Sequence, residues 1–252
     1  MKAVLKYPGA KWRISEWIIS HFPEHKVYCE PFFGSGAVFF NKPQTYIETI
    51  NDIDGNIVNL FKVCRDNPEE LARLIEFTPF AREEFENCYD KSDDSLEQAR
   101  RTLVRYHQSF GTSNSSKKSW RNVQTYGGPR TATMWNYLPG RISEICARLK
   151  EAQIENIDAI ELIRRYNDEN TLLYCDPPYL HSLRRKNMYS CELSEEYHIN
   201  LLSVLKESKS KIVLSGYDSQ LYNSMLSGWN TDEKQTTAQM GKHRVEKIWF
   251  NF

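Results

Sequence analysis

The sequence carries no excess charge of either sign and no long apolar run. Its 33 lysine and arginine residues are matched by 33 aspartate and glutamate residues, so the charge of the whole chain does not favour a nucleic-acid partner. No stretch of about 18 apolar residues is present to span a membrane, and no early apolar run resembles a signal peptide. We therefore expect a cytoplasmic protein without a membrane partner, in which any nucleic acid binds to local patches of charge.

Cysteine and histidine are scattered rather than grouped at the spacing of metal ligands. The six cysteines include no C-x-x-C pair. A zinc site is therefore not expected, and the cysteines are expected to be reduced, as in a cytoplasmic chain. At 252 residues the chain is long enough for one α/β domain with an inserted subdomain.

Short apolar strands alternate with helical segments in the first 60 residues and again beyond residue 150. Strands are expected over residues 26–30, 46–52, 171–176, 211–217 and 245–250. Helices are expected over residues 11–19, 37–40 and 194–206, with another beginning at residue 55. This alternation predicts an α/β fold built on a doubly wound, Rossmann-like sheet.

The segment from residue 61 to residue 150 has a different, mainly helical pattern and a segregated charge. Residues 62–97 contain 11 acidic and five basic side chains, whereas residues 113–130 contain four basic side chains and no acidic one. We interpret residues 61–150 as a helical subdomain inserted between the two parts of the sheet domain, 1–60 and 151–252. Its basic stretch is where an anionic polymer would bind.

A glycine turn follows the first expected strand. Gly34 and Gly36 allow a ligand to approach the backbone closely at the carboxyl edge of the sheet, and Asp52 ends the next strand, where an acid accepts hydrogen bonds from a ribose diol. The alternatives are an ordinary tight turn and, for Asp52, the N-cap of the next helix. A dinucleotide is disfavoured because Phe39 stands in place of a third glycine. Together the residues indicate a nucleoside-containing ligand.

The tetrapeptide Asp176-Pro177-Pro178-Tyr179 follows an apolar strand and stops its hydrogen-bonding ladder. The Asp176 carboxylate and the Pro177 carbonyl are two acceptors for the hydrogens of an aromatic amine such as that of adenine, and they would expose the lone pair of its nitrogen. Tyr179 offers a flat face for the base. The alternative is a strand-terminating turn with a packing tyrosine.

These motifs together resemble the Dam-like, alpha-class DNA adenine methyltransferases, which use S-adenosylmethionine. Residues 7–11 are similar to the amino-terminal cofactor motif of that class, residues 30–36 to its glycine loop, and residues 176–179 to its catalytic motif. The sequence departs from the family pattern at Ala10, which replaces a glycine, and at Ile157, where an aromatic residue is frequent. The resemblance covers almost the whole chain and implies that the target adenine is flipped out of the duplex.

The resemblance also implies the roles of individual residues, and it implies no metal. The implied catalytic residues are Asp176, Pro177, Pro178 and Tyr179. The implied contacts of S-adenosylmethionine are Tyr7, Lys11, Glu30, Phe32, Gly34, Gly36, Asp52, Asn156, Ile157, Asp158 and Asp176. An alternative for Lys11 is a solvated residue in the first turn of a helix.

Basic and aromatic side chains of the insert, and of the loop after the tetrapeptide, are candidates for DNA contacts. The set is Arg105, Gln108, Lys117, Lys118, Trp120, Arg121, Tyr126, Arg130, Arg184, Arg185 and Lys186. The charged members suit backbone phosphates, and the aromatic ones suit insertion into the base stack. Arg101, Arg105 and Gln108 lie roughly a helical turn apart, a spacing that suits contacts in the major groove. The alternatives are a flexible solvated loop for the basic stretch and, for Arg101, Arg105 and Gln108, a salt-bridged face toward the acidic segment 83–97.

The predicted function is site-specific methylation of the N6 amine of adenine in double-stranded DNA, with no obligatory protein partner. An RNA adenine methyltransferase, and a DNA-binding protein that keeps the fold without catalysis, are the alternatives. A protein amide as acceptor is disfavoured, because the tetrapeptide begins with Asp176 and not with asparagine. The motifs give neither the recognition sequence nor a choice between restriction-modification, host regulation and a phage role.

Overall fold

The computed structural model describes residues 1–110, 119–124, 126–128, 130–180, 192–237 and 243–252. These residues form one seven-stranded sheet in the order β3-β2-β1-β4-β5-β7-β6. The strands are β1 Val27–Glu30, β2 Ile47–Asn51, β3 Gln153–Glu155, β4 Thr171–Cys175, β5 Lys211–Gly216, β6 Asn230–Thr237 and β7 His243–Phe250. Strands β1 to β5 are parallel, and β7 is antiparallel to its neighbours β5 and β6.

The order of the parallel strands confirms the predicted doubly wound α/β fold. Strand β1 lies between β2 and β4, so successive strands are added on opposite sides of it. Ligands of such sheets bind at the carboxyl ends of the strands next to this reversal. Strand β4 is buried along its whole length, as expected for a parallel strand covered on both faces.

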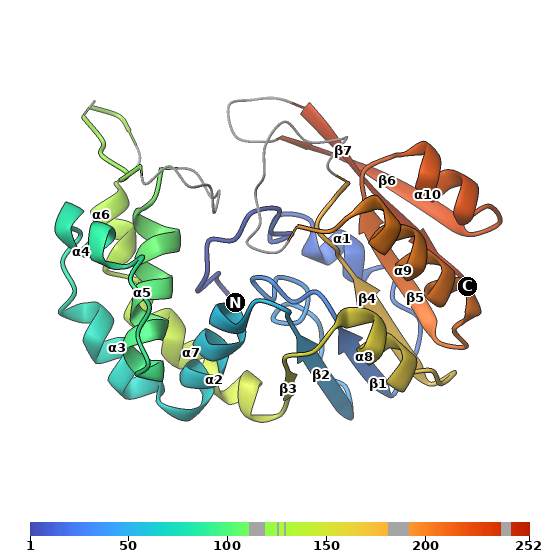
Figure 1. Ribbon diagram of the computed structural model, residues 1–252, viewed down its shortest axis with the longest axis horizontal. Helices are drawn as coiled ribbons and strands as arrows, with labels where there is room; N and C mark the ends of the chain where they lie inside the picture. The colour runs from blue at the N-terminus through green and yellow to red at the C-terminus, as the bar shows by residue number, and fades with distance from the viewer. Residues whose placement is uncertain (111–118, 125, 129, 181–191, 238–242) are drawn as a thin grey trace.

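Helices surround this sheet and extend to one side of it. They are α1 Ser15–Ile19, α2 Gly55–Asp66, α3 Pro68–Glu76, α4 Arg82–Asn87, α5 Ser95–Gln108, α6 Thr131–Trp135, α7 Leu138–Lys150, α8 Ala159–Arg165, α9 Glu195–Glu207 and α10 Gln220–Met225. Figure 1 shows α3 to α7 gathered on one side of the molecule, with β5 to β7 on the other. In the same view β1, β2 and β4 lie between these two groups.

Two apolar clusters cover the two faces of the sheet. Leu172 and Tyr174 of β4 belong to the cluster that includes α2, α5 and α7, whereas Leu173 and Cys175 belong to the cluster that includes α8 and α9. This alternation follows from the two-residue period of a strand. The first cluster continues without a break from the sheet into the helical region, so the two regions share a core.

The structure differs from the sequence-based expectation at several elements. Residues 37–40 form a turn and not a helix, with Phe40 N donating to Gly36 O over 2.9 Å, because the run is too short to extend beyond one turn. Strands β3 and β6 were not expected, since β3 has three residues and β6 is polar along an edge. The first helix begins at Ser15 and not at residue 11. The expected start of the insert, residue 61, lies inside α2, and the subdomain boundary stays a prediction.

No helix in the described part of the chain has the length and apolar character needed to cross a membrane. The cysteines whose positions are described are all buried and unbridged, namely Cys29, Cys64, Cys88, Cys146 and Cys175.

Candidate active site

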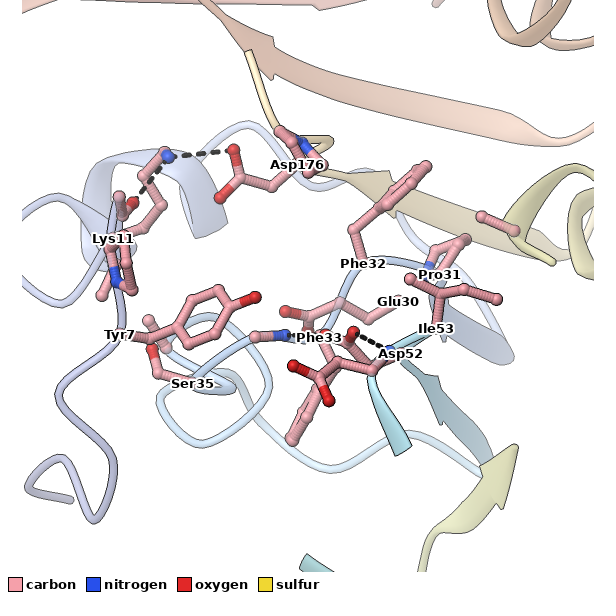
Figure 2. Close-up of a pocket in the computed structure, with 18 of the residues that line it drawn as sticks. Tyr7, Lys11, Glu30, Pro31, Phe32, Phe33, Ser35, Asp52, Ile53 and Asp176 are labelled. Atoms are coloured by element: carbon pink, nitrogen blue, oxygen red, sulfur yellow. Dashed lines mark hydrogen bonds and ion pairs between the residues drawn. The ribbon is translucent and has the colours of Figure 1, made fainter. Parts of the chain in front are cut away.

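A cavity of about 290 Å³ opens at the carboxyl ends of β1, β2 and β4. Its walls come from the amino-terminal segment, from the loops after β1 to β4, and from the beginning of α9. Figure 2 shows Tyr7, Lys11, Asp52 and Asp176 around one space, although they come from segments far apart in the sequence. The cavity thus lies beside the strand-order reversal, where a doubly wound sheet binds its ligand.

The ionisable side chains that line this cavity are mainly acidic. Lys11 is the one lysine or arginine among the described lining residues. The lining carboxylates are Glu30, Asp52, Asp54, Asp158, Asp176 and Glu192. Phe32 and Ile53 add apolar walls. Such a lining favours a cationic ligand with an apolar ring and disfavours a phosphate-bearing one.

Asp52 is fixed by two backbone N–H groups. Gly34 N donates to Asp52 Oδ2 over 2.8 Å and Asp54 N donates to Asp52 Oδ1 over 2.9 Å. Burial raises the pKa of Asp52 to about 6, against the lowering effect of these backbone donors. The N-cap of α2 is Asp54, whose side chain accepts from Asn56 N, so the capping alternative for Asp52 is wrong. Asp52 instead presents acceptor oxygens at the cavity wall.

The two glycines of the turn have different roles. Gly34 lines the cavity at φ +51°, and a Cβ there would lie 2.9 Å from the ring of Tyr7. Gly36, at φ +67°, does not line the cavity, and a Cβ there would lie 2.4 Å from the ring of Phe33. The predicted ligand approach therefore fits Gly34, whereas the structure explains Gly36 by the packing of phenylalanine rings.

Lys11 and Asp176 form an ion pair at one end of the cavity. Their Nζ and Oδ1 atoms are 2.9 Å apart, and Lys11 Nζ also donates to Gly9 O over 2.8 Å (Figure 2). The Lys11 side chain is 5% exposed, so the alternative of a solvated lysine is wrong. Burial raises the pKa of Asp176 to about 6, although the Lys11 ammonium lowers it. A partly desolvated carboxylate of this kind is a strong hydrogen-bond acceptor for a ligand.

Glu30, the last residue of β1, is the most deeply buried acid of the cavity. The Tyr28 hydroxyl donates to Glu30 Oε2 over 2.7 Å. The pKa of Glu30 is raised to about 8, chiefly by burial and also by the charge of Asp176, against the lowering effect of the Tyr28 hydroxyl. A cation bound next to Glu30 would favour its ionised form.

The tetrapeptide turns away from the sheet directly behind the cavity. Pro178 lines the cavity, Pro177 is buried, and Tyr179 is 6% exposed without lining the cavity. The Tyr179 ring lies edge-on to Tyr217, with centroids 4.4 Å apart. Tyr179 is therefore packed and anchored in this structure, and its role as a platform for a base stays a prediction.

One of the three residues that follow β3 reaches the cavity. Asp158 lines it and also caps α8 through Ile160 N and Glu161 N. Asn156 does not line it, because its Nδ2 donates to Asp52 O over 2.7 Å. Ile157 does not line it either, and its backbone N–H donates to Asn51 Oδ1 over 3.0 Å. The structure thus places Asn156 and Ile157 as supports of the cavity wall, and their role as contacts of a ligand stays a prediction.

The proposed DNA contacts near the end of α5 are partly engaged within the protein. Gln108 is fully buried, its Nε2 donates to Pro79 O, and its Oε1 accepts from Trp120 Nε1, so the expectation that it faces a groove is not met. Arg101 pairs with Glu97 at 2.7 Å, as in the salt-bridged alternative. The Arg105 guanidinium lies over the ring of Tyr89, 5.0 Å from its centre.

Other members of the candidate DNA surface differ in exposure. Trp120 is half-buried, with its ring 5.8 Å from that of Phe80. Arg121 Nε donates to Ser109 O, whereas Tyr126 and Arg130 are exposed. Lys117, Lys118, Arg184, Arg185 and Lys186 lie outside the described residues. The DNA role of all these residues stays a prediction.

Several residues near the ligand space were missed from the sequence, and three of them matter for the arguments below. Ile53 lines the cavity and is 48% exposed, and Tyr197 lines it while its hydroxyl donates to Asp158 Oδ2 over 2.9 Å. Glu246 accepts from the Tyr179 hydroxyl over 2.6 Å. No sequence motif marks Glu246, Ile53 or Tyr197, since the strand that carries Glu246 also carries other charged residues.

Comparison with known proteins gives consistent matches along the chain. The family model of the D12 class N6 adenine-specific DNA methyltransferases matches residues 7–240. A DNA adenine methylase of Haemophilus influenzae is 24% identical over 242 residues, which cover 89% of this chain and 82% of that protein. The DNA adenine methylase of Escherichia coli K12 is 24% identical over 256 residues, covering 98% and 87%.

Two further matches complete the comparison. A type II methyltransferase of Lactococcus lactis subsp. cremoris is 25% identical over 281 residues, covering 96% of this chain and 90% of that protein. Among solved structures, an rRNA methylase of Streptococcus thermophilus superposes with a TM-score of 0.41 at 7% identity, covering 95% of this chain and 94% of that one.

Proposed function

We propose the following chemistry for this chain, which belongs to the D12 class of N6 adenine-specific DNA methyltransferases. The enzyme methylates the N6 amine of adenine in DNA. We assign S-adenosylmethionine to the cavity and the target amine to the space in front of Asp176 (Figure 2). The observation that carries this assignment is the convergence of six carboxylates on a cavity that ends at the Lys11–Asp176 pair.

The lining residues fit S-adenosylmethionine in charge and shape. When bound, this cofactor supplies an electrophilic methyl group on a cationic sulfonium. Glu30 and its neighbouring carboxylates would hold the cationic part of the cofactor, and Asp52 would accept hydrogen bonds from its ribose hydroxyls. Phe32 and Ile53 would flank its adenine ring.

Asp176 and Pro177 are assigned to the amine of the target adenine. The lone pair of an adenine amine is delocalised into the ring, and the amine is therefore a weak nucleophile. Two acceptors on its two hydrogens, the Asp176 carboxylate and the Pro177 carbonyl, favour a tetrahedral nitrogen whose lone pair is exposed. The rigid proline backbone keeps both acceptors in place. Most of the rate enhancement then comes from this activation and from alignment with the methyl donor.

The substrate is assigned as double-stranded DNA with its target adenine flipped out. The Asp176 side chain is 18% exposed, at the end of a cavity behind the sheet edge. A base stacked in a duplex does not reach such a position, so the nucleotide has to leave the helix. The half-buried and exposed basic residues around the cavity mouth would then bind the flanking phosphates.

Lys6, Arg121 and Arg141 form the best-defined basic group near this mouth. Lys6 precedes the cavity residue Tyr7, Arg121 Nε donates to Ser109 O, and Arg141 Nη1 donates to Ala3 O over 2.9 Å. None of the three forms an ion pair within the described part of the chain. Burial and the charges of the two guanidinium groups together lower the pKa of Lys6 to about 8. A phosphate would relieve this repulsion.

Cofactor affinity is expected to depend on the ionisation of Glu30. The pKa of Glu30 is raised to about 8 by burial, so the free protein carries it mostly protonated below that pH. A bound cation favours the ionised form, and binding below pH 8 therefore releases a proton and is weakened. We expect the ratio of wild-type affinity to Glu30→Gln affinity to rise by up to about tenfold per pH unit toward pH 8 and then to level off.

Calorimetric titration of S-adenosylmethionine from pH 6.5 to 8.5, in two buffers of different ionisation heat, measures this ratio and the released proton. Protonation of the cofactor itself affects both proteins equally, so it cancels in the ratio of the two affinities. A ratio that stays constant over the range would remove Glu30 from the cationic part of the site. Absence of binding by the wild-type protein at every pH would contradict the cofactor assignment as a whole.

DNA affinity is expected to depend on the basic group near the cavity mouth. Replacing Arg141 or Lys6 with glutamine removes one phosphate contact, so the slope of log affinity against log salt should fall by about one. Fluorescence anisotropy with a labelled duplex at several salt concentrations measures the slope. Arg73→Gln is the matched control, because Arg73 is 63% exposed on α3 and already paired with Glu70. If all three variants keep the wild-type slope, the DNA binds elsewhere on the protein. Competition with unlabelled single-stranded DNA and with RNA tests the preference for the duplex.

A further inference from the structure

Four side chains from three separate segments of the chain meet next to the cavity. Lys11 Nζ is 2.9 Å from Asp176 Oδ1 and 3.9 Å from Glu246 Oε2. The Tyr179 hydroxyl donates to the same Glu246 oxygen over 2.6 Å, and Lys11 Nζ lies 4.8 Å from the centre of the Tyr179 ring. One ammonium group therefore faces two carboxylates, and one of them also holds the tyrosine of the tetrapeptide.

All four side chains are shielded from solvent. The side chains of Lys11, Asp176 and Glu246 are 5%, 18% and 13% exposed, and Tyr179 is 6% exposed. Glu246 lies on β7 and does not line the cavity, so it reaches neither the cofactor space nor the amine space directly. Any effect of Glu246 on the reaction is exerted through Lys11, Tyr179 and Asp176.

The reaction makes two demands on Asp176. In the structure its carboxylate pairs with the Lys11 ammonium, whereas the proposed function needs it as an acceptor for the adenine amine. A buried ammonium that loses its carboxylate is strongly destabilised. Among the described residues near Lys11 Nζ, Glu246 is the second carboxylate within 4 Å, and its position is already fixed by the Tyr179 hydroxyl.

We propose, on the basis of the proposed function, that Glu246 is a positioning residue that takes over the Lys11 ammonium when the adenine amine reaches Asp176. Through the same carboxylate it fixes the Tyr179 ring beside the incoming base. The step exchanges one ion pair and one hydrogen bond, and no covalent bond forms or breaks. Without Glu246, Lys11 competes with the amine for Asp176.

The charge of Glu246 also acts on Asp176. Burial raises the pKa of Asp176, Lys11 lowers it, and the negative charge of Glu246 raises it again. The titratable groups that face this cluster from the packed elements are Lys11, Glu30, Tyr174, Cys175, Tyr179, Tyr222 and Glu246. The pKa values of the tyrosines and of the cysteine are raised, so these groups do not titrate near neutral pH. Glu30 does titrate near neutral pH, because its pKa is raised to about 8. Under the proposed function, saturating cofactor keeps Glu30 ionised during the rate measurements.

The test compares Glu246→Gln and Glu246→Ala with Glu233→Gln, which removes an exposed carboxylate that pairs with Lys247 on the same hairpin. Single-turnover methyl transfer is measured at saturating cofactor and DNA. Glutamine keeps an acceptor for Tyr179 but has no charge for Lys11, so we expect a rate about tenfold lower. Alanine also releases the Tyr179 ring, and we expect a rate about 10²-fold lower. Glu233→Gln should keep the wild-type rate.

Two further measurements separate this role from a purely structural one. In a Lys11→Met background, Glu246→Gln should add less than about a twofold effect, because glutamine still accepts from the Tyr179 hydroxyl and the lost charge acts on the rate through Lys11. The carboxyl titration of Asp176, followed in cofactor-free protein by NMR of ¹³C-labelled aspartate and assigned with Asp176→Asn, should move to lower pH in Glu246→Gln.

A wild-type rate in Glu246→Gln, or an unchanged Asp176 titration, would overturn the proposal about Glu246 even if the wild-type enzyme methylates adenine normally. A wild-type protein that binds no S-adenosylmethionine would instead contradict the proposed function. If Glu246→Ala does not fold, the isosteric Glu246→Gln still decides the question, because its rate and its titration are predicted separately.

Discussion

Asp176→Asn is expected to lower the rate of methyl transfer to DNA by about 10³-fold while leaving the fold intact. Asparagine has a similar shape, but its amide carries no negative charge and brings its own N–H donors toward Lys11 and the incoming amine. Five other carboxylates remain in the cavity, so cofactor binding should persist. The loss should therefore appear in the chemical step and not in the affinity for S-adenosylmethionine.

The pH dependence of the wild-type reaction follows from the same residue. Burial raises the pKa of Asp176 to about 6, and the ionised carboxylate is a stronger acceptor for the amine than the protonated carboxyl group, which also carries a donor. The rate should therefore be maintained above this pKa and fall as the pH drops through about 6. Single-turnover assays with labelled cofactor measure both effects. The control is Asp93→Asn, which changes an exposed aspartate before α5. A wild-type rate in Asp176→Asn would rule out activation of the amine by this carboxylate.

The sequence predicted those parts of the site that depend on local motifs and on the parallel sheet. Asp52 and Asp176 each follow a parallel strand, and the carboxyl ends of neighbouring parallel strands lie at one edge of the sheet. Their meeting around one cavity was therefore predictable once the strands were recognised. Lys11 was placed by the family resemblance, whereas its pairing with Asp176 depends on how the amino-terminal segment folds back.

The remaining parts depend on contacts that no local pattern encodes. Glu246 reaches Tyr179 because β7 inserts antiparallel between β5 and β6, and the sequence gives no indication of that strand order. The position of Asn156 also depends on a contact between distant segments, because its side chain donates to the backbone carbonyl of Asp52. Gln108 was expected on the helix face that contacts DNA because of its spacing to Arg101 and Arg105. In the structure it is buried, and Trp120 Nε1 donates to its Oε1. Burial by a distant segment is a tertiary property, and helix periodicity alone does not report it.

Gly36→Ala is expected to lower the free energy of unfolding by about 3 kcal/mol. The residue has φ +67°, which an alanine adopts at a cost of about 1–2 kcal/mol. In addition, the new Cβ would lie 2.4 Å from the ring of Phe33 and 2.6 Å from the ring of Phe40, which pack edge to face in the core. Both rings would have to move, and Phe33 also lines the cavity. Urea denaturation followed by circular dichroism measures the change.

Gly228→Ala separates the two causes of this loss. Gly228 has φ +94°, and a Cβ there would meet no atom within 4 Å, so only the backbone cost applies and about 1–2 kcal/mol should be lost. The excess loss in Gly36→Ala then measures the clash with the phenylalanine rings. If the two variants lose equal stability, the rings accommodate the methyl group, and packing does not explain the glycine. In that case the positive φ alone would account for the glycine at this position.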